Sequence, residues 1–425
     1  MSQSSRVGLV PLTALFIGLG AAAATAQTLG AGATATGIDS VALGDNSLAS
    51  GDGSTAAGAL SEASGLEGSA FGVESLASGD FSTAIGGVST ASGNNSTALG
   101  HESEASGDGA TALGGSSIAS GLQSTAAGEF SSASGLQSTA TGQFSTASGD
   151  FSTATGQASL ASGDGSTATG QFSTASGLSS TATGTGSEAS GDFSTAMGTG
   201  SVASGQASLA SGVDSVASGL QSTATGEFST ASGDFSTATG QASLASGDGS
   251  TATGQFSTAS GEDSTALGQG AQATHANAMA LGAGAQTTAA NQVVIGGATN
   301  TYTTPGITSA ASRAAQTGAV ELVTSDAQGN LATDGGATAA AIRGLNGDVR
   351  ENRDGVALAL AMQSPSLAGA ENFALSGGFG TYAGGSAFAA TGAVRISPNA
   401  QFDGGIGVGF RENRVGGRIG VTFKW

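Results

Sequence analysis

A unit of seven residues, Ser-x-Ala-x-Gly-x-x, repeats without a break from Ala26 to about Thr299. When the glycine is taken as position five, 37 of the 39 sites from Gly30 to Gly296 carry glycine, and the exceptions are His275 and Ala289. No insertion or deletion disturbs the register. A register held over so many units is typical of repeat architectures, in which each unit stacks on its neighbours.

The composition of the unit excludes a coiled coil and favours short strands joined by turns. A coiled coil needs large apolar residues at two positions of every seven, whereas the fixed positions here are Ser, Ala and Gly. Glycine at position five, followed by mostly polar residues at positions six and seven, is typical of a turn. We therefore predict one strand of about five residues and one turn in every unit.

Position four alternates along the chain, which doubles the period to 14 residues. One set of units carries an apolar residue or Thr there, and the other set carries almost only Ser. Two strands per coil, stacked in register, predict a parallel β-solenoid of about 19 coils and a rod on the order of 90 Å long. Positions one, three and five share one strand face, and their Ser, Ala and Gly are small enough to fill a thin roll.

The first strand set is predicted to contact other copies of the chain. A roll filled with Ala, Ser and Gly buries too little apolar surface to offset the entropy of ordering the chain. We assign the missing core to association through Leu43, Ile85, Leu99 and Leu113. The Ser set is expected to face water. Its outward apolar residues either form a candidate ligand surface or only pair along the sheet: Leu48, Leu76, Ile118, Leu160 and Leu244.

The distribution of charge excludes nucleic-acid binding for most of the chain. No Lys or Arg lies between Val7 and Ser312, a stretch with 21 acidic residues, and the formal net charge of the chain is −20. Phosphate backbones are bound by basic side chains. The chain also has no cysteine, so a thiolate metal site is impossible. We expect no cofactor and no enzymatic activity, because His101 and His275 lie in no catalytic or metal-binding pattern.

The sequence predicts four regions. Residues 1–26 read as a secretory signal peptide, with Arg6, an apolar stretch and an A-x-A site before Gln27. Residues 27–299 form the repeat head, and residues 300–335 form a connector rich in turn signals. Residues 336–425 combine one helix, at 337–362, with four alternating segments. In the helix, Ile342, Leu345 and Val349 lie near heptad spacing and are assigned to the same core between copies.

The four C-terminal segments, near residues 371–382, 385–397, 399–410 and 414–425, have the length of tilted membrane strands. Phe423 and Trp425 are assigned to the membrane interface. Four strands cannot close a barrel, and open strand edges are not tolerated in lipid. Three copies would supply about twelve strands, enough for a closed barrel with helices inside. The head and the membrane segments therefore both predict association, by independent routes.

The whole chain resembles the YadA-like trimeric autotransporter adhesins. The motifs that carry this resemblance are "NSTALG" (Asn95–Gly100), "FSTAIG" (Phe81–Gly86), "ENRDGVALALAM" (Glu351–Met362) and the terminal "VTFKW". The resemblance implies a left-handed parallel β-roll head that forms a homotrimer, and a 12-stranded outer-membrane barrel that anchors and exports its own passenger. It also implies contact with outer-membrane lipid and the barrel assembly machinery, and attachment to host matrix, host cells or other bacteria. Related heads often carry Val and Ile at positions two and four where this chain mostly carries Thr, which argues against collagen binding.

Three alternatives remain open. The chain could be a passive surface-coat or biofilm fibre that recognises no specific ligand. The Thr-x-Thr pairs, such as Thr153 with Thr155 and Thr167 with Thr169, could bind ice, although we expect their faces to contact other copies. Asp residues after glycine could bind calcium as in nonapeptide β-rolls, but the period differs and the ligand rows are sparse.

Overall fold

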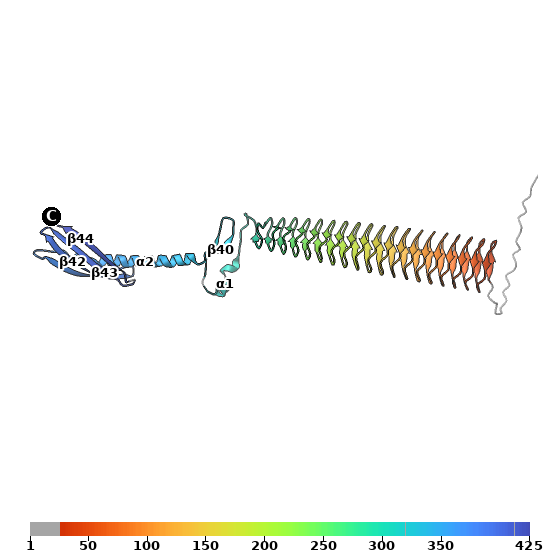
Figure 1. The fold of residues 1–425 in the computed structure, drawn as a ribbon, viewed down its shortest axis with the longest axis horizontal. Coiled ribbons are helices and arrows are strands. Elements are labelled where there is room, and N and C mark those ends of the chain that lie inside the picture. Colours follow the sequence, from red (N-terminus) through yellow and green to blue (C-terminus); the bar gives the residue numbers. More distant parts are fainter. Residues whose placement is uncertain (1–25, 319, 412) are drawn as a thin grey trace, which may run out of the picture. The chain divides into compact units, whose positions relative to one another are not determined.

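The computed structural model of the chain describes residues 26–318, 320–411 and 413–425 (Figure 1). These residues form two compact units, divided between Thr301 and Tyr302. The signal peptide predicted for residues 1–26 lies, apart from Ala26, outside the described residues.

The first unit is a parallel β-solenoid with 14 residues in each coil, as the repeat predicts. Three-residue strands recur every 14 residues from β1 (Gln27–Leu29) to β37 (Met279–Leu281) and are followed by β38 (Val293–Ile295). Together they form a 20-stranded sheet. Two-residue strands recur with the same spacing from β2 (Thr34–Ala35) to β36 (Gln272–Ala273) and form the second sheet. The strands are shorter than the expected five residues, because the turns between them occupy more of each unit.

The interior of the solenoid consists of the small residues at positions one and three. Ala140 and Ala147, at position three of successive units, are fully buried, and so are Ser145 and Ser152 at position one. Position two is mostly half-buried, for example at Thr153, and position four of the three-residue strands is mostly exposed, for example at Thr155. The predicted division into an inward and an outward face is therefore confirmed.

Each coil has two turns that differ in conformation. The first turn follows the three-residue strand, as in 142–145, and the second turn follows the two-residue strand, as in 149–152. Both are closed by a hydrogen bond from the position-one N–H to the carbonyl of the position-five glycine. The position-five glycine has a φ of +126° at Gly142, in a region that favours glycine, whereas Gly149 has no such φ. Position seven is left-handed in both turns, with φ of 59° at Phe144 and 58° at Phe151.

The second unit starts with short connecting elements and ends in an antiparallel sheet. The connecting elements are η1 (Pro305–Thr308), α1 (Ala310–Ala315) and a hairpin of β39 (Val323–Ser325) with β40 (Leu331–Thr333). The helix α2 (Ala337–Ala361) then leads to the four strands, as predicted. These are β41 (Phe373–Tyr382), β42 (Gly385–Ser397), β43 (Ala400–Gly409) and β44 (Val415–Phe423), paired in that order.

The C-terminal part of α2 lies against one face of this sheet (Figure 1). Ala357, Leu358 and Ala361 are buried there. Glycines make the close approach possible, since a Cβ at Gly378 would collide with the carbonyl of Ala361 and a Cβ at Gly380 with that of Ala357. Among the described residues, no helix has both the length and the apolar character needed to cross a bilayer.

Candidate interaction surfaces and membrane anchor

The head residues assigned to the core between copies lie in one row on the 20-stranded sheet. Leu43, Ile85, Leu99 and Leu113 occupy position four of their strands and are 37–45% exposed in the single chain. The register places Leu99 between Ile85 and Leu113, and Phe71 extends the row beyond Ile85. Ala57 lies between Leu43 and Phe71 in the same row. The row from Leu43 to Leu113 is therefore an apolar ladder that the chain itself does not cover.

Threonine replaces the apolar residues further along the same sheet. Thr139 and Thr141 of β17 pair with Thr153 and Thr155 of β19, and the pattern continues through β21 (Thr167–Thr169). A second block covers β29 (Thr223–Thr225) to β33 (Thr251–Thr253). The Thr-x-Thr rows therefore lie on the same face as the apolar ladder, so one contact between copies would cover both.

The candidate ligand surface lies on the other sheet and is discontinuous. Leu76 has Glu62 and Thr90 as its neighbours in the adjacent coils, and Leu160 lies between Thr146 and Thr174. The four leucines of this set, Leu48, Leu76, Leu160 and Leu244, are half-buried, and Ile118 is exposed. No two of the five residues lie in neighbouring coils, so each one is a single apolar side chain in a mostly polar row.

The edges of the solenoid carry hydrogen-bonded ladders that we did not predict. In the first turns, Gln143 Nε2 donates to Glu129 Oε2 at 3.0 Å, and Gln157 Nε2 donates to Gln143 Oε1 at 3.2 Å. The ladder continues to Gln171. In the second turns, Asp side chains accept a backbone N–H of the preceding coil, as Asp150 Oδ1 does from Leu136. The recurrence of Gln and Asp at a spacing of 14 residues was the available sequence signal.

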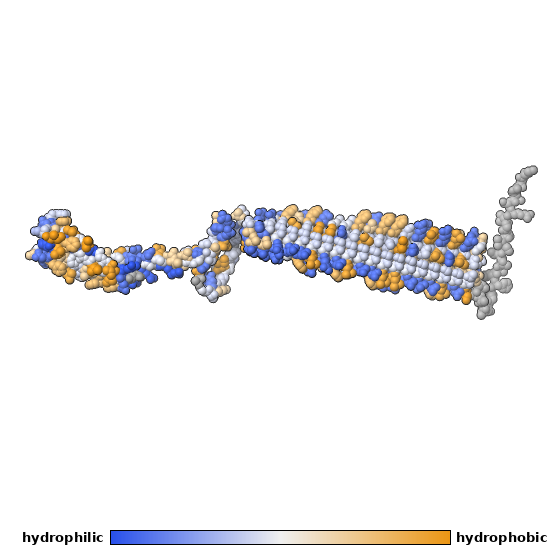
Figure 2. Space-filling model, viewed as in Figure 1, coloured by the Kyte–Doolittle hydropathy of each residue, from blue (hydrophilic) through white to orange (hydrophobic). Residues whose placement is uncertain are grey.

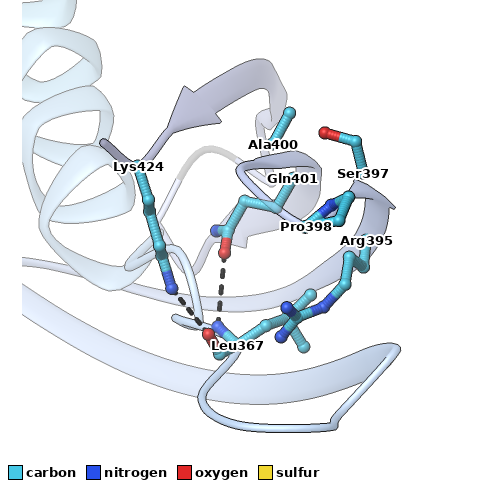
Figure 3. Close-up of a pocket in the computed structure, with 7 residues that line it drawn as sticks. All are labelled: Leu367, Arg395, Ser397, Pro398, Ala400, Gln401 and Lys424. Carbon is cyan, nitrogen blue, oxygen red and sulfur yellow. Dashed lines mark hydrogen bonds between the residues drawn. The ribbon is translucent and has the colours of Figure 1, made fainter.

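In the second unit, polar side chains of the strands hold the segment that joins α2 to β41. Lys424 Nζ donates to the carbonyl of Leu367 at 2.6 Å, and the Leu367 N–H donates to Gln401 Oε1 at 3.2 Å (Figure 3). Thr391 Oγ1 donates to the carbonyl of Gln363. These bonds fix the position of the segment between the end of α2 and the start of β41.

The remaining predicted site residues are exposed in the single chain. Ile342, Leu345 and Val349 lie on the part of α2 that extends beyond the sheet, and their side chains contact no core. Phe423 ends β44, and Trp425 is fully exposed. Their assignments to a core between helices and to a membrane interface stay predictions.

The connector contains one carboxylate that organises the start of α2. Asp334 accepts hydrogen bonds from the backbone N–H groups of Leu322, Gly336 and Thr338. Hydrogen bonds from the side chain and backbone of Thr338 are the main cause that lowers the pKa of Asp334 from 3.8 to about 2. Asp334 thus joins the hairpin of β39 and β40 to the first turn of the helix.

No group of three or more His, Asp or Glu side chains within the described residues is arranged to hold a metal ion. His101 lies in a first turn, and the nearest charged group to its Nδ1 is Glu102 at 3.9 Å. His275 accepts or donates one hydrogen bond with Thr274.

Two family models match the chain, and together they cover more than half of it. The YadA head domain repeat matches twelve overlapping or adjacent stretches between residues 35 and 285. The YadA-like membrane anchor domain matches residues 365–425.

Among solved structures, the chain is similar to the collagen-binding domain of the Yersinia adhesin YadA. It is 23% identical, and the match covers 40% of this chain and 73% of that chain with a TM-score of 0.20. No curated protein sequence matches the chain.

Proposed function

This chain belongs to the YadA-like trimeric autotransporter adhesins, and from that premise we propose that its head attaches the cell to host matrix, to host cells or to sibling cells. The anchor holds the protein in the outer membrane, and the head is presented at the cell surface. The observation that carries the proposal is the combination of an anchor with a long solenoid whose turns carry exposed side chains in the single chain.

We further propose that three copies associate through the apolar ladder of Leu43, Ile85, Leu99 and Leu113 and through Ile342, Leu345 and Val349 of α2. Twelve strands from three anchors would close the barrel through which the passenger is exported. Supporting this proposal, these residues are exposed in the single chain, and β41 and β44 are the unpaired edges of the four-stranded sheet. The assembly machinery for outer-membrane barrels would insert this twelve-stranded barrel into the membrane.

Deleting residues 27–299 while keeping the signal peptide and the anchor tests adhesion. Cells with the full chain and with the deletion are compared for attachment to collagen, fibronectin, host cells and each other. Loss of attachment to one surface identifies the partner, and loss of self-clumping alone favours a biofilm role. Unchanged behaviour on all four surfaces would leave only a passive coat. We favour adhesion over ice binding because the Thr-x-Thr rows share a face with the proposed trimer ladder, and an ice-recrystallisation assay on the full chain checks that preference.

A further inference from the structure

Phenylalanine recurs at position seven of the turns, where the backbone disfavours it. Phe144 and Phe172 in first turns have φ of 59° and 58°. A bulky residue in the left-handed region is strained, and Gly186 and Gly200 occupy equivalent first-turn positions without that strain. The rings are also 51–59% exposed at Phe144, Phe172 and their counterparts Phe228 and Phe256, so burial within the chain does not compensate for the strain. Strain of this kind is typical of residues kept for function.

Two of these rings, in neighbouring coils, stack on each other. Phe130 and Phe144 lie in adjacent first turns with ring centroids 5.1 Å apart and planes inclined by 2°. In the next coil Ala158 takes this position, and in the coil after that Phe172 resumes the row. The N–H of Ala158 bonds to the carbonyl of Gln143, and that of Phe172 to the carbonyl of Gln157, so the coils remain in step. The aromatic row therefore lacks one ring at Ala158.

The coil spacing sets the distance across the position of the missing ring. Two coils span about 10 Å, which is twice the 5.1 Å spacing of the existing stack. A single six-membered ring placed above Ala158 would contact Phe144 on one side and Phe172 on the other, within the centroid spacing of about 4.5–7 Å that stacked rings adopt. Ala158 is half-buried and supplies a small floor.

The same arrangement occurs a second time. Phe228, Ala242 and Phe256 stand 84 residues after Phe144, Ala158 and Phe172, in a segment that duplicates the first almost letter for letter. All three have left-handed backbones of the same kind. Six coils separate the two gaps, or about 29 Å. In Figure 2, apolar groups alternate with polar groups along the edges of the solenoid.

The polar residues beside the gaps restrict the ligand. Gln143, Gln157 and Gln171 lie next to the first gap, and each bond between their amides uses one N–H and one oxygen lone pair. The remaining donors and acceptors of each amide are free for hydroxyl groups. No Lys or Arg lies between Val7 and Ser312, so nothing in the head can pair with an anionic ligand.

We propose that the gaps at Ala158 and Ala242 each bind one pyranose ring of an uncharged glycan. The C–H faces of the sugar pack on the negative faces of the two phenylalanine rings. Its edge hydroxyls hydrogen-bond the glutamine amides beside the first gap, and Glu227, Gln241 and Gln255 beside the second. This inference rests on the proposed adhesive function and names its ligand class. A trimer presents six such gaps, so weak single contacts add up to firm attachment on a dense glycan surface.

The test measures saccharide binding by the detergent-extracted full-length trimer. The probes are immobilised cellobiose, lactose, maltose and chitobiose, with sialyllactose and a heparin oligosaccharide as anionic comparators. One variant fills both gaps, Ala158→Phe with Ala242→Phe, and a second removes one wall of each, Phe172→Ala with Phe256→Ala. The matched control, Phe151→Ala with Phe235→Ala, removes equally exposed rings from second turns. The trimer band of each variant on an unheated gel is recorded alongside.

We expect the wild type and the control to bind at least one neutral disaccharide, and both gap variants to lose tenfold or more of that affinity as intact trimers. Three results overturn the inference: no neutral saccharide binds, the filled variant binds as well as the wild type, or the gap variants dissociate while the control does not. The last result would show that the phenylalanines pack between copies. Adhesion of cells carrying the filled variant at wild-type level would contradict the glycan site and leave the proposed function standing.

Discussion

The carboxylate of Asp403 on β43 lies 3.2 Å from the guanidinium group of Arg418 on β44, and only 2% of the Asp403 side chain is exposed. Arg418 also donates a hydrogen bond to the carbonyl of Met362, where α2 ends. Ser364 and Thr422 complete the contacts of Asp403 through their hydroxyl groups. An ion pair between a buried carboxylate and a partly exposed guanidinium group therefore connects the end of the helix to the last two strands of the anchor.

Replacing Arg418 by Met is expected to weaken the anchor strongly. The substitution leaves the buried Asp403 carboxylate without its cation. Because the Arg418 side chain is 43% exposed, the loss should be smaller than the ~3–5 kcal/mol of a fully buried pair, but larger than that of an exposed one. The temperature at which the detergent-extracted trimer dissociates on a gel should fall clearly. Arg414→Met is the matched control, because Arg414 pairs with Glu351 at 3.3 Å with both side chains well exposed, and an exposed pair contributes about 1 kcal/mol or less.

A second variant distinguishes the effect of an unpaired charge on the dissociation temperature from the effect of lost packing. Replacing both partners, Asp403→Leu with Arg418→Met, removes the unpaired charge and should recover much of the dissociation temperature. If Arg418→Met and Arg414→Met lower that temperature equally, the ion pair has no special role in the anchor.

The start of α2 is expected to depend on pH through Asp334. Its pKa is lowered in the folded chain to about 2, mainly by hydrogen bonds from Thr338. A lowered folded-state pKa contributes stability that is complete above the ordinary value of 3.8 and is lost as the pH falls through about 2. Pepsin cleavage in the hairpin of β39 and β40 should therefore be faster in Asp334→Asn than in the wild type at pH 4.

This difference in cleavage should vanish below about pH 2, where the wild-type carboxyl is also protonated. Asp348→Asn, on the exposed middle of α2, controls for the change in charge and should behave as the wild type at both pH values. Equal cleavage of Asp334→Asn and wild type at pH 4 would show that the carboxylate does not hold the hairpin to the helix.

The parts of this molecule that the sequence predicts are those set by strict periodicity. The 14-residue coil, the buried Ala140 and Ala147 and the outward Leu99 all follow from the spacing of small and large residues. The recurrence of Gln143 and Gln157 at a spacing of 14 residues also indicates their ladder, but it does not fix the side-chain rotamers that form the hydrogen bond. The hydrogen bond from Lys424 to Leu367 joins residues 57 positions apart, which no local pattern encodes.

The two rows of buried serines are expected to respond differently to alanine. Ser145 Oγ, after a first turn, donates to the carbonyl of Gly142 at 2.8 Å. Ser152 Oγ, after a second turn, is buried with no hydrogen-bond partner among the described residues. Ser145→Ala should cost about 1 kcal/mol, because it leaves that carbonyl with one partner fewer, whereas Ser152→Ala removes an unsatisfied hydroxyl and should be neutral or stabilising.

Hydrogen–deuterium exchange of the coil around residues 139–155 in the full-length trimer measures this difference. Exchange should become faster in Ser145→Ala and stay equal or become slower in Ser152→Ala. Faster exchange in Ser152→Ala would show that its hydroxyl has a partner in the assembled protein, such as a buried water molecule.

Two glycines of a single turn can be used to test whether position five of the repeat tolerates a side chain. Gly184 has a φ of +133°, and a Cβ there would lie 2.6 Å from the carbonyl oxygen of Gly198 in the next coil. Gly186, at position seven, has a φ of +64° and open space within 4 Å of an added Cβ, and alanine already occupies such a site at Ala158. We expect Gly186→Ala to cost about 1 kcal/mol or less, and Gly184→Ala to separate the coils and cost several times more.

Limited proteolysis of the full-length trimer measures this difference. Because each coil contacts only its neighbours, a new cut should appear near residues 184–198 in Gly184→Ala alone. Equal resistance of both variants would mean that the coils can move apart at the glycine row without loss of order.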